Sequence, residues 1–279
     1  MLFANKILLL QSRDFHDETK LSGLIAIVDK RKFALNTPMK KLLGGNLKLC
    51  CSKDRLNYLS TLINEEYNDV EVFYAVPFPY LSFAREIFPS HVRIAAQDCS
   101  EFINGAYTGE VSAEMLVDIG VKSVIIGHSE RRKLYDDEKS VCKKVMNAFK
   151  TGMNVLLCVG EDEVQRRQNE TISVVAKQLK SVLECMIEQN ISCIDVAYEP
   201  VWSIGTGNVP NNKEIEEVIS FIRQELNNYN VNGRVIYGGS VSEKNVETLC
   251  NIKCLDGFLV GKSSTTDEFV HIARALNQK

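Results

Sequence analysis

The chain has 279 residues, of which 45% are hydrophobic and 25% charged, a composition typical of a globular protein and unlike that of disordered or collagen-like chains. It contains no run of about 18 consecutive apolar residues, which argues against a membrane-spanning helix. The formal net charge of -3 excludes the strongly basic character typical of nucleic-acid-binding proteins. Length alone fits either one large domain or two ordinary ones.

Residues 1–41 differ from the rest of the chain in charge. They carry 8 Lys or Arg and 4 Asp or Glu, a net charge of +4, so residues 42–279 carry the remaining -7. The apolar run 7–10 is too brief for a signal-peptide core, and Asp14, Asp17 and Glu18 argue against a transit peptide. We expect an N-terminal extension, with an added arm, a targeting segment and a mispredicted translation start as open alternatives.

From residue 42 onward, short apolar runs rich in Val, Ile and Leu show little polar alternation, as expected of strands buried on both faces. Eight strands are predicted, at 42–49, 71–76, 92–97, 123–126, 155–159, 194–199, 234–237 and 257–260.

Stretches with helical character lie between these runs and after the last one. The predicted helices span 53–66, 80–88, 113–119, 137–151, 163–189, 212–229, 242–249 and 266–277. Alternating strands and helices predict an α/β fold with a parallel sheet. Eight repeats in about 240 residues favour a closed (β/α)8 TIM barrel over an open sheet. We therefore predict a single barrel domain over 42–279, preceded by the extension 1–41.

The nine cysteines are odd in number and include no Cys-x-x-Cys pair. This pattern suggests neither a disulfide framework nor a zinc site. Because several cysteines lie within apolar runs, we expect buried thiols in a reducing compartment.

In such a barrel, functional groups lie just past the carboxyl ends of the strands. Lys48, His128 and Glu199 fall at the predicted ends of the first, fourth and sixth strands. Glycine-containing turns after strands six, seven and eight can present backbone N–H groups to a phosphate. This set suits proton abstraction next to a carbonyl, with Glu199 taking the proton, His128 donating to the oxygen and Lys48 stabilising the negative charge.

Each of these residues also has an ordinary structural explanation. Lys48 alone is typical of a solvated surface charge, and His128 alone of a capping or structural histidine. Glu199 precedes Pro200 and could simply end a strand, since that position favours extended backbone. The functional interpretation depends on all three falling at strand ends together with the glycine turns.

Several motifs carry a family likeness. From about residue 40 to the C-terminus the chain resembles triosephosphate isomerases. The matching segments are GGNLK at 44–48, IIGHSERR at 125–132, LCVGE at 157–161, AYEPVWSIGTG at 197–207, YGGSV at 237–241 and DGFLVGKSS at 256–264.

The resemblance implies interconversion of dihydroxyacetone phosphate and glyceraldehyde 3-phosphate without metal or cofactor. It implies that Glu199 is the base, that His128 is a neutral electrophile, and that Lys48 and Asn46 are its electrostatic and polar partners. Glu130 would orient Lys48. The resemblance also puts His128 at the start of a short helix, where we expect the helix dipole to lower its pKa.

Further residues acquire expected roles from the same resemblance. Residues 200–207 would form a lid that closes over the phosphate, with Gly205 supplying an N–H. Ser240 and Gly261 would be the other phosphate contacts. Residues 98–112 resemble a protruding dimer loop that would bring Thr108 close to Asn46 and Lys48 of the partner subunit, although an ordinary exposed loop is the alternative. We expect a homodimer.

Some positions depart from the family pattern. Lys262 stands where a second glycine is usual, so its side chain could crowd the turn, point outward, or add attraction for the phosphate. We expect retained activity with altered substrate affinity. Asn208 replaces a lysine of the lid hinge, and Cys50 and Cys51 replace a polar residue and a glycine.

Two functions from different classes therefore stand side by side: an isomerase, and a catalytically weakened barrel that only binds phosphate ligands. A metal-dependent sugar-phosphate epimerase is disfavoured because no cluster of acidic ligands follows the strands. The partners we expect are a triose phosphate and a second copy of the chain, with neither nucleic acid nor membrane. For localisation, the extension favours a plastid-like organelle, with the cytoplasm as the alternative.

Overall fold

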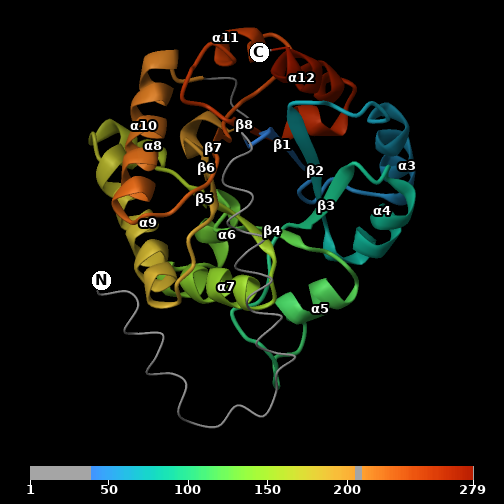
Figure 1. Ribbon diagram of the computed structural model, residues 1–279, viewed down its shortest axis with the longest axis horizontal. Coiled ribbons are helices and arrows are strands. Elements are labelled where there is room, and N and C mark those ends of the chain that lie inside the picture. Colours follow the sequence, from blue (N-terminus) through green and yellow to red (C-terminus); the bar gives the residue numbers. More distant parts are fainter. Residues whose placement is uncertain (1–38, 205–208, 279) are drawn as a thin grey trace, which may run out of the picture. The chain divides into compact units, whose positions relative to one another are not determined.

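The computed structural model describes residues 39–204 and 209–278 of the chain. Figure 1 shows its strands at the centre, with helices around them. Eight parallel strands pair in chain order, and the last pairs with the first to close a barrel. The strands are β1 (Lys41–Asn46), β2 (Val70–Val76), β3 (Val92–Ala96), β4 (Ser123–Ile126), β5 (Asn154–Val159), β6 (Asp195–Tyr198), β7 (Val235–Tyr237) and β8 (Gly257–Val260).

Helices connect successive strands on the outside of the barrel (Figure 1). This arrangement confirms the predicted (β/α)8 fold. The α-helices are α3 (Lys53–Leu62), α4 (Leu81–Ile87), α5 (Ala113–Asp118), α6 (Ser129–Leu134), α7 (Glu138–Lys150), α8 (Glu163–Arg167), α9 (Thr171–Glu188), α10 (Asn212–Asn228), α11 (Val246–Leu249) and α12 (Glu268–Asn277), and the 3-10 helices are η3 (Phe78–Tyr80), η4 (Val201–Ser203) and η5 (Lys262–Thr265).

Polar caps determine where several helices begin. The hydroxyl of Ser52 accepts a hydrogen bond from the backbone N–H of Arg55 (3.2 Å) at the start of α3. At α7, the carboxylate of Asp137 accepts from the N–H of Ser140 (2.7 Å). These contacts satisfy backbone donors that the first helical turn leaves without a partner.

The predicted helix 163–189 is wrong in one respect, because the structure divides it into α8 and α9. Asp162 and Gln165 form a capping box at the start of α8. Asn169 then adopts φ +57°, a left-handed conformation that interrupts the helix. The helix predicted over 242–249 is also shorter than expected, since only Val246–Leu249 is helical.

Buried apolar side chains form two layers. The larger lies between the strands and the surrounding helices, and a smaller one fills the inside of the barrel. The strands therefore bury both faces, which explains their continuous apolar runs. The inner layer consists of Leu42, Phe73, Ala75, Ala95, Ile125, Leu156, Cys158, Ala197, Ile236 and Leu259.

The expectation of unpaired thiols is wrong for two cysteines, because Cys142 and Cys185 form a disulfide. They lie 43 residues apart on α7 and α9, so sequence spacing could not reveal the pair. Cys50, Cys51, Cys99, Cys158 and Cys254 form no disulfide, and of these five only Cys99 and Cys158 are buried as expected. In the part of the chain that the structure describes, no group of His, Cys, Asp or Glu side chains could hold a metal ion.

Residues 1–38 of the predicted extension lie outside the described residues, so the domain boundary at residue 41 stays a prediction. Over the residues that are described, no helix has the length and apolar character required to span a membrane.

Candidate active site

A cavity of about 460 Å³ opens at the carboxyl ends of the strands, a volume typical of small-molecule sites. It brings together residues that follow five different strands of the barrel. Among its lining residues are Asn46, Lys48, His128, Glu199, Ser240, Gly261 and Lys262, all of which the sequence analysis singles out.

Lys48 follows β1 in a constrained conformation. Its φ of +50° is unusual for a residue with a side chain, and its N–H donates to Oδ1 of Asn46 (3.0 Å). Its ammonium lies 2.8 Å from Oε1 of Glu130. Gln97 also fixes this turn, because its Nε2 donates to the carbonyl oxygens of Lys48 and Ala75 (3.0 Å each). The charge of Lys48 is therefore held from both its backbone and its side chain.

His128 occupies the N-cap of α6, where its Nδ1 accepts a hydrogen bond from the N–H of Glu130 (3.2 Å). An Nδ1 that accepts carries no proton, so the neutral ring holds its proton on Nε2. Nε2 lies 3.1 Å from Oε1 of Glu199. The capping contact thus selects the tautomer that presents an N–H donor to the cavity.

Glu199 follows β6 and is only 2% exposed. Its Oε2 accepts a hydrogen bond from the N–H of Ser129 (3.0 Å), at the start of α6. Two glycines give it room: a Cβ on Gly160 would lie 1.8 Å from the carbonyl oxygen of Glu199, and one on Gly238 would lie 2.9 Å from its Cγ. The carboxylate is therefore held in a tightly packed niche at the edge of the cavity.

The buried pair of His128 and Glu199 shifts the pKa of each member. Burial lowers the pKa of His128, but the Glu199 carboxylate raises it and prevails, so it lies above its ordinary value. Burial raises the pKa of Glu199, but His128 and the Ser129 N–H lower it and prevail. The expected lowering of the His128 pKa is therefore wrong in this arrangement, because the carboxylate contact outweighs the helix terminus.

The residues expected to hold a phosphate also line the cavity. The hydroxyl of Ser240 donates to the carbonyl oxygen of Ser203 (2.6 Å), which ties the turn after β7 to η4. A Cβ on Gly261 would lie 3.6 Å from Cε of Lys48. Lys262 opens η5 with an exposed side chain and without positive φ, so the turn accommodates it without backbone strain.

The first part of the expected lid is anchored by a buried carboxylate. Glu161 is fully buried and accepts hydrogen bonds from Nε1 of Trp202 (2.9 Å) and the hydroxyl of Tyr198 (3.2 Å). These contacts attach η4 to the turn after β5. The other lid residues that the sequence analysis singles out, Gly205 and Asn208, lie outside the described residues.

Thr108 is exposed and is not among the residues that line the cavity, so a single chain does not bring it to the site. The loop that carries it is fastened at its base to α7. Nζ of Lys143 lies 2.5 Å from Oε2 of Glu101, and Phe102 stacks on Tyr107 with ring centroids 3.6 Å apart.

Sequence reasoning missed several residues that build the site. Gln97 and Glu161 each lie one or two residues past a strand, which is the position that could have suggested them. Gly160 and Gly238 also follow strands, but only the packed structure shows that each makes room for Glu199.

Comparison with known proteins identifies relatives of this barrel. A family model described as Triosephosphate isomerase matches residues 41–276. Proteins of that name from Paracoccidioides lutzii and Emericella nidulans are 39% and 37% identical over 246 residues, which cover 85% of this chain and 99% of theirs. Another from Azoarcus sp. is 39% identical over 241 residues, covering 84% of this chain and 98% of its own.

Proposed function

This chain belongs to the triosephosphate isomerase family, and we propose that it interconverts dihydroxyacetone phosphate and glyceraldehyde 3-phosphate. The chain is accordingly an isomerase. One observation supports the specific reaction: His128 and Glu199 contact each other at the edge of one cavity that Lys48 also lines. A buried carboxylate, a ring N–H donor and an ammonium are the groups that enolisation of a carbonyl compound requires.

The proton transfer is assigned to Glu199. Its lowered pKa keeps it ionised at neutral pH, as a base must be. Glu199 removes a proton from the hydroxyl-bearing carbon beside the substrate carbonyl, leaving an enediolate. The proton of that hydroxyl group passes to the former carbonyl oxygen through Nε2 of His128, which donates its own proton to one oxygen and takes one from the other. Glu199 then returns its proton to the neighbouring carbon, which completes the isomerisation. For this the carboxylate has to turn from His128 towards the substrate.

His128 and Lys48 stabilise the enediolate. The Nε2–H of His128 donates a hydrogen bond to the oxygen that gains negative charge, and the capping of Nδ1 keeps that proton on Nε2. Lys48 adds a fixed positive charge, which Glu130 holds in place at 2.8 Å. Asn46 supports the backbone of Lys48. When Glu199 turns away, the main cause that raises the His128 pKa is removed, and the ring is neutral for its donor role.

The phosphate is assigned to the turns after β7 and β8. Ser240 and Gly261 offer backbone N–H groups there, and Lys262 adds a side-chain charge. Gly205 is the fourth expected contact and belongs to the lid. The reaction needs no cofactor, since a base, a donor and an ammonium account for each proton and charge in it.

A homodimer is part of the proposal. The loop that carries Thr108 presents exposed Ile103 and Tyr107, which are 45% exposed each, and Leu49 beside Lys48 is 97% exposed. Apolar side chains at these two places suit contact between two copies of the chain. A monomeric mass by light scattering at micromolar concentration, together with full activity, would refute this part.

A coupled assay with glyceraldehyde 3-phosphate tests the function. We expect turnover by the parent protein and a loss of roughly 100-fold or more in kcat for Glu199→Gln, because a general base contributes about 10²–10⁴-fold. Glu163→Gln is the matched control, since Glu163 is exposed on α8 and forms a surface ion pair with Arg167. Binding of inorganic phosphate without turnover would instead favour the catalytically weakened barrel.

A further inference from the structure

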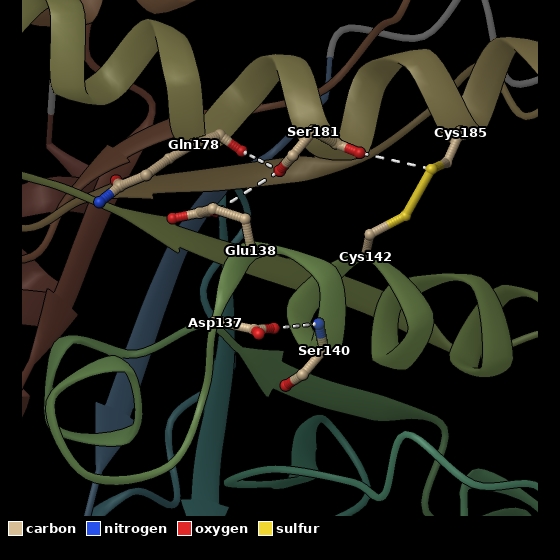
Figure 2. Close-up of a disulfide and its surroundings, with 7 residues drawn as sticks. All are labelled: Asp137, Glu138, Ser140, Cys142, Gln178, Ser181 and Cys185. Carbon is tan, nitrogen blue, oxygen red and sulfur yellow. Dashed lines mark hydrogen bonds between the residues drawn. A yellow bond between two sulfur atoms is a disulfide. The ribbon is translucent and has the colours of Figure 1, made fainter.

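The disulfide between α7 and α9 belongs to no part of the proposed reaction. Figure 2 shows Cys142 on one helix facing Cys185 on the other, across the seam where the two helices pack together. Both residues are half-buried and not enclosed in the core. Between them the chain runs through β5 and α8, so a bond here closes a loop around one strand and helix unit of the barrel.

The surroundings also suit the reduced pair. The sulfur of Cys185 lies 3.3 Å from the carbonyl oxygen of Ser181, one helical turn earlier (Figure 2). A thiol at this position can donate to that carbonyl, whereas a disulfide sulfur has no proton to donate. The thiol form of Cys185 therefore has a hydrogen-bond partner ready.

We propose that Cys142 and Cys185 form a reversible thiol–disulfide pair, oxidised by a low-molecular-weight disulfide such as oxidised glutathione, that fastens α7 to α9. One cysteine thiolate attacks the small disulfide and forms a mixed disulfide, releasing one small thiol. The other cysteine thiolate attacks the protein sulfur of that mixed disulfide and releases the second small thiol. The two cysteines lose two protons and two electrons, and the small disulfide gains both.

Polar contacts connect this seam with the residue before His128. The hydroxyl of Ser181 donates a hydrogen bond to Oε2 of Glu138 (3.4 Å), as Figure 2 shows. Both carboxylate oxygens of Glu138 accept hydrogen bonds from Nη1 of Arg132 (2.9 Å each). Nε of Arg132 donates to the carbonyl oxygen of Gly127 (2.7 Å).

The disulfide therefore stabilises the packing of α7 against α9, and the contacts of Ser181, Glu138 and Arg132 connect this packing to the backbone before His128. We expect it to change resistance to unfolding more than kcat, because no member of the pair touches the cavity. Closing a loop of 43 residues restricts the unfolded chain, and we expect it to raise the melting temperature by roughly 5–10 °C.

The test equilibrates the full-length protein in glutathione buffers of graded redox ratio, alkylates the remaining thiols, and identifies the modified peptides by mass. We expect Cys142 and Cys185 to lose reactivity together at one midpoint. The melting temperature should rise over the same range in the parent protein, and should not rise in Cys142→Ser or Cys185→Ser.

Cys254→Ser serves as the matched control, because Cys254 is another half-buried cysteine that the structure leaves free of a disulfide. It should retain the full redox-dependent rise. Independent alkylation of Cys142 and Cys185 under all ratios would overturn the proposal, as would an oxidised pair with an unchanged melting temperature. Neither readout depends on isomerase activity, so failure here and failure of the proposed function are distinguishable.

Discussion

Nε2 of His128 lies 3.1 Å from Oε1 of Glu199, so the proposed electrophile and the proposed base are hydrogen-bonded to each other. His128 is 5% exposed and Glu199 2% exposed, so both are shielded from solvent. The charge of each residue therefore strongly affects the pKa of the other. Their titrations are therefore coupled and belong to the pair. The contact with His128 keeps Glu199 ionised. This contact must open before Glu199 can reach a substrate carbon.

Replacing Glu199 with Gln should lower the pKa of His128. The carboxylate is the strongest cause that raises this pKa, while burial and Lys48 lower it and persist in the variant. NMR titration of labelled histidine measures the change. Glu130→Gln is the control and should produce a smaller decrease, because Glu130 lies farther away, with 3.7 Å between its Oε2 and Nδ1 of His128.

The same shift predicts how stability depends on pH. Since the folded-state pKa of His128 is raised, its contribution to stability is complete below about pH 6.5 and is lost as the pH rises through the folded-state value. Glu199→Gln should lack this decline in urea unfolding. An unchanged His128 titration in Glu199→Gln would contradict the proposed coupling.

Glu130→Gln should also reduce catalysis by loosening Lys48. The ammonium would lose its charged partner at 2.8 Å, while the Glu130 N–H that caps His128 would remain. Because the Glu130 side chain is 55% exposed, solvent screens the pair, and we expect only about a 3–10-fold lower kcat/KM. Steady-state kinetics measures this, with Glu163→Gln as the control. Equal kcat/KM for the two variants would show that Glu130 does not position Lys48.

The barrel could be predicted from the sequence because each strand is a separate apolar run and each main helix has its own period. The interruption of the helix at Asn169 could not be predicted, since the polar residues there are also typical of an exposed helix face. Lys48, His128 and Glu199 could be found because strand ends converge on one rim. The pKa of His128 depends on its burial and on its 3.1 Å contact with Glu199, and neither can be read from the sequence. The disulfide likewise depends on how α7 and α9 pack.

Lys262→Gly should weaken substrate binding without changing kcat. Lys262 lines the cavity and its backbone is unstrained, so the side chain contributes mainly attraction for a phosphate. An exposed charge pair is worth up to about 1 kcal/mol, which corresponds to a rise in KM of about 2–5-fold. The effect should shrink as salt concentration rises.

Lys262→Met is the matched control for this prediction, because it keeps the side-chain length and removes only the charge. Both variants should show the same increase in KM. If neither KM nor kcat changes in either variant, the departure at position 262 is neutral for the proposed reaction.

Lys144→Met should destabilise the fold by about 3–5 kcal/mol, because it leaves two buried carboxylates with only the partly exposed Arg131 as their cation. Nζ of Lys144 lies 2.8 Å from both Asp98 Oδ2 and Asp136 Oδ1, and all three residues are buried. Urea unfolding at pH 7 measures the loss. Lys143→Met is the control, since Lys143 pairs with Glu101 at the surface, and its free energy of unfolding should match the parent's within error.

The loss in Lys144→Met should shrink as the pH falls from 7 towards 5. Burial raises the pKa of Asp98, and Lys144 partly offsets that rise. Without Lys144 the pKa of Asp98 rises further, so acidification protonates the carboxyl in the folded state and removes the buried charge that Lys144 no longer balances. A carboxyl with a raised folded-state pKa favours folding at low pH and loses that contribution as the pH increases. A loss that is the same at both pH values would mean that the destabilisation comes from packing and not from the buried charges.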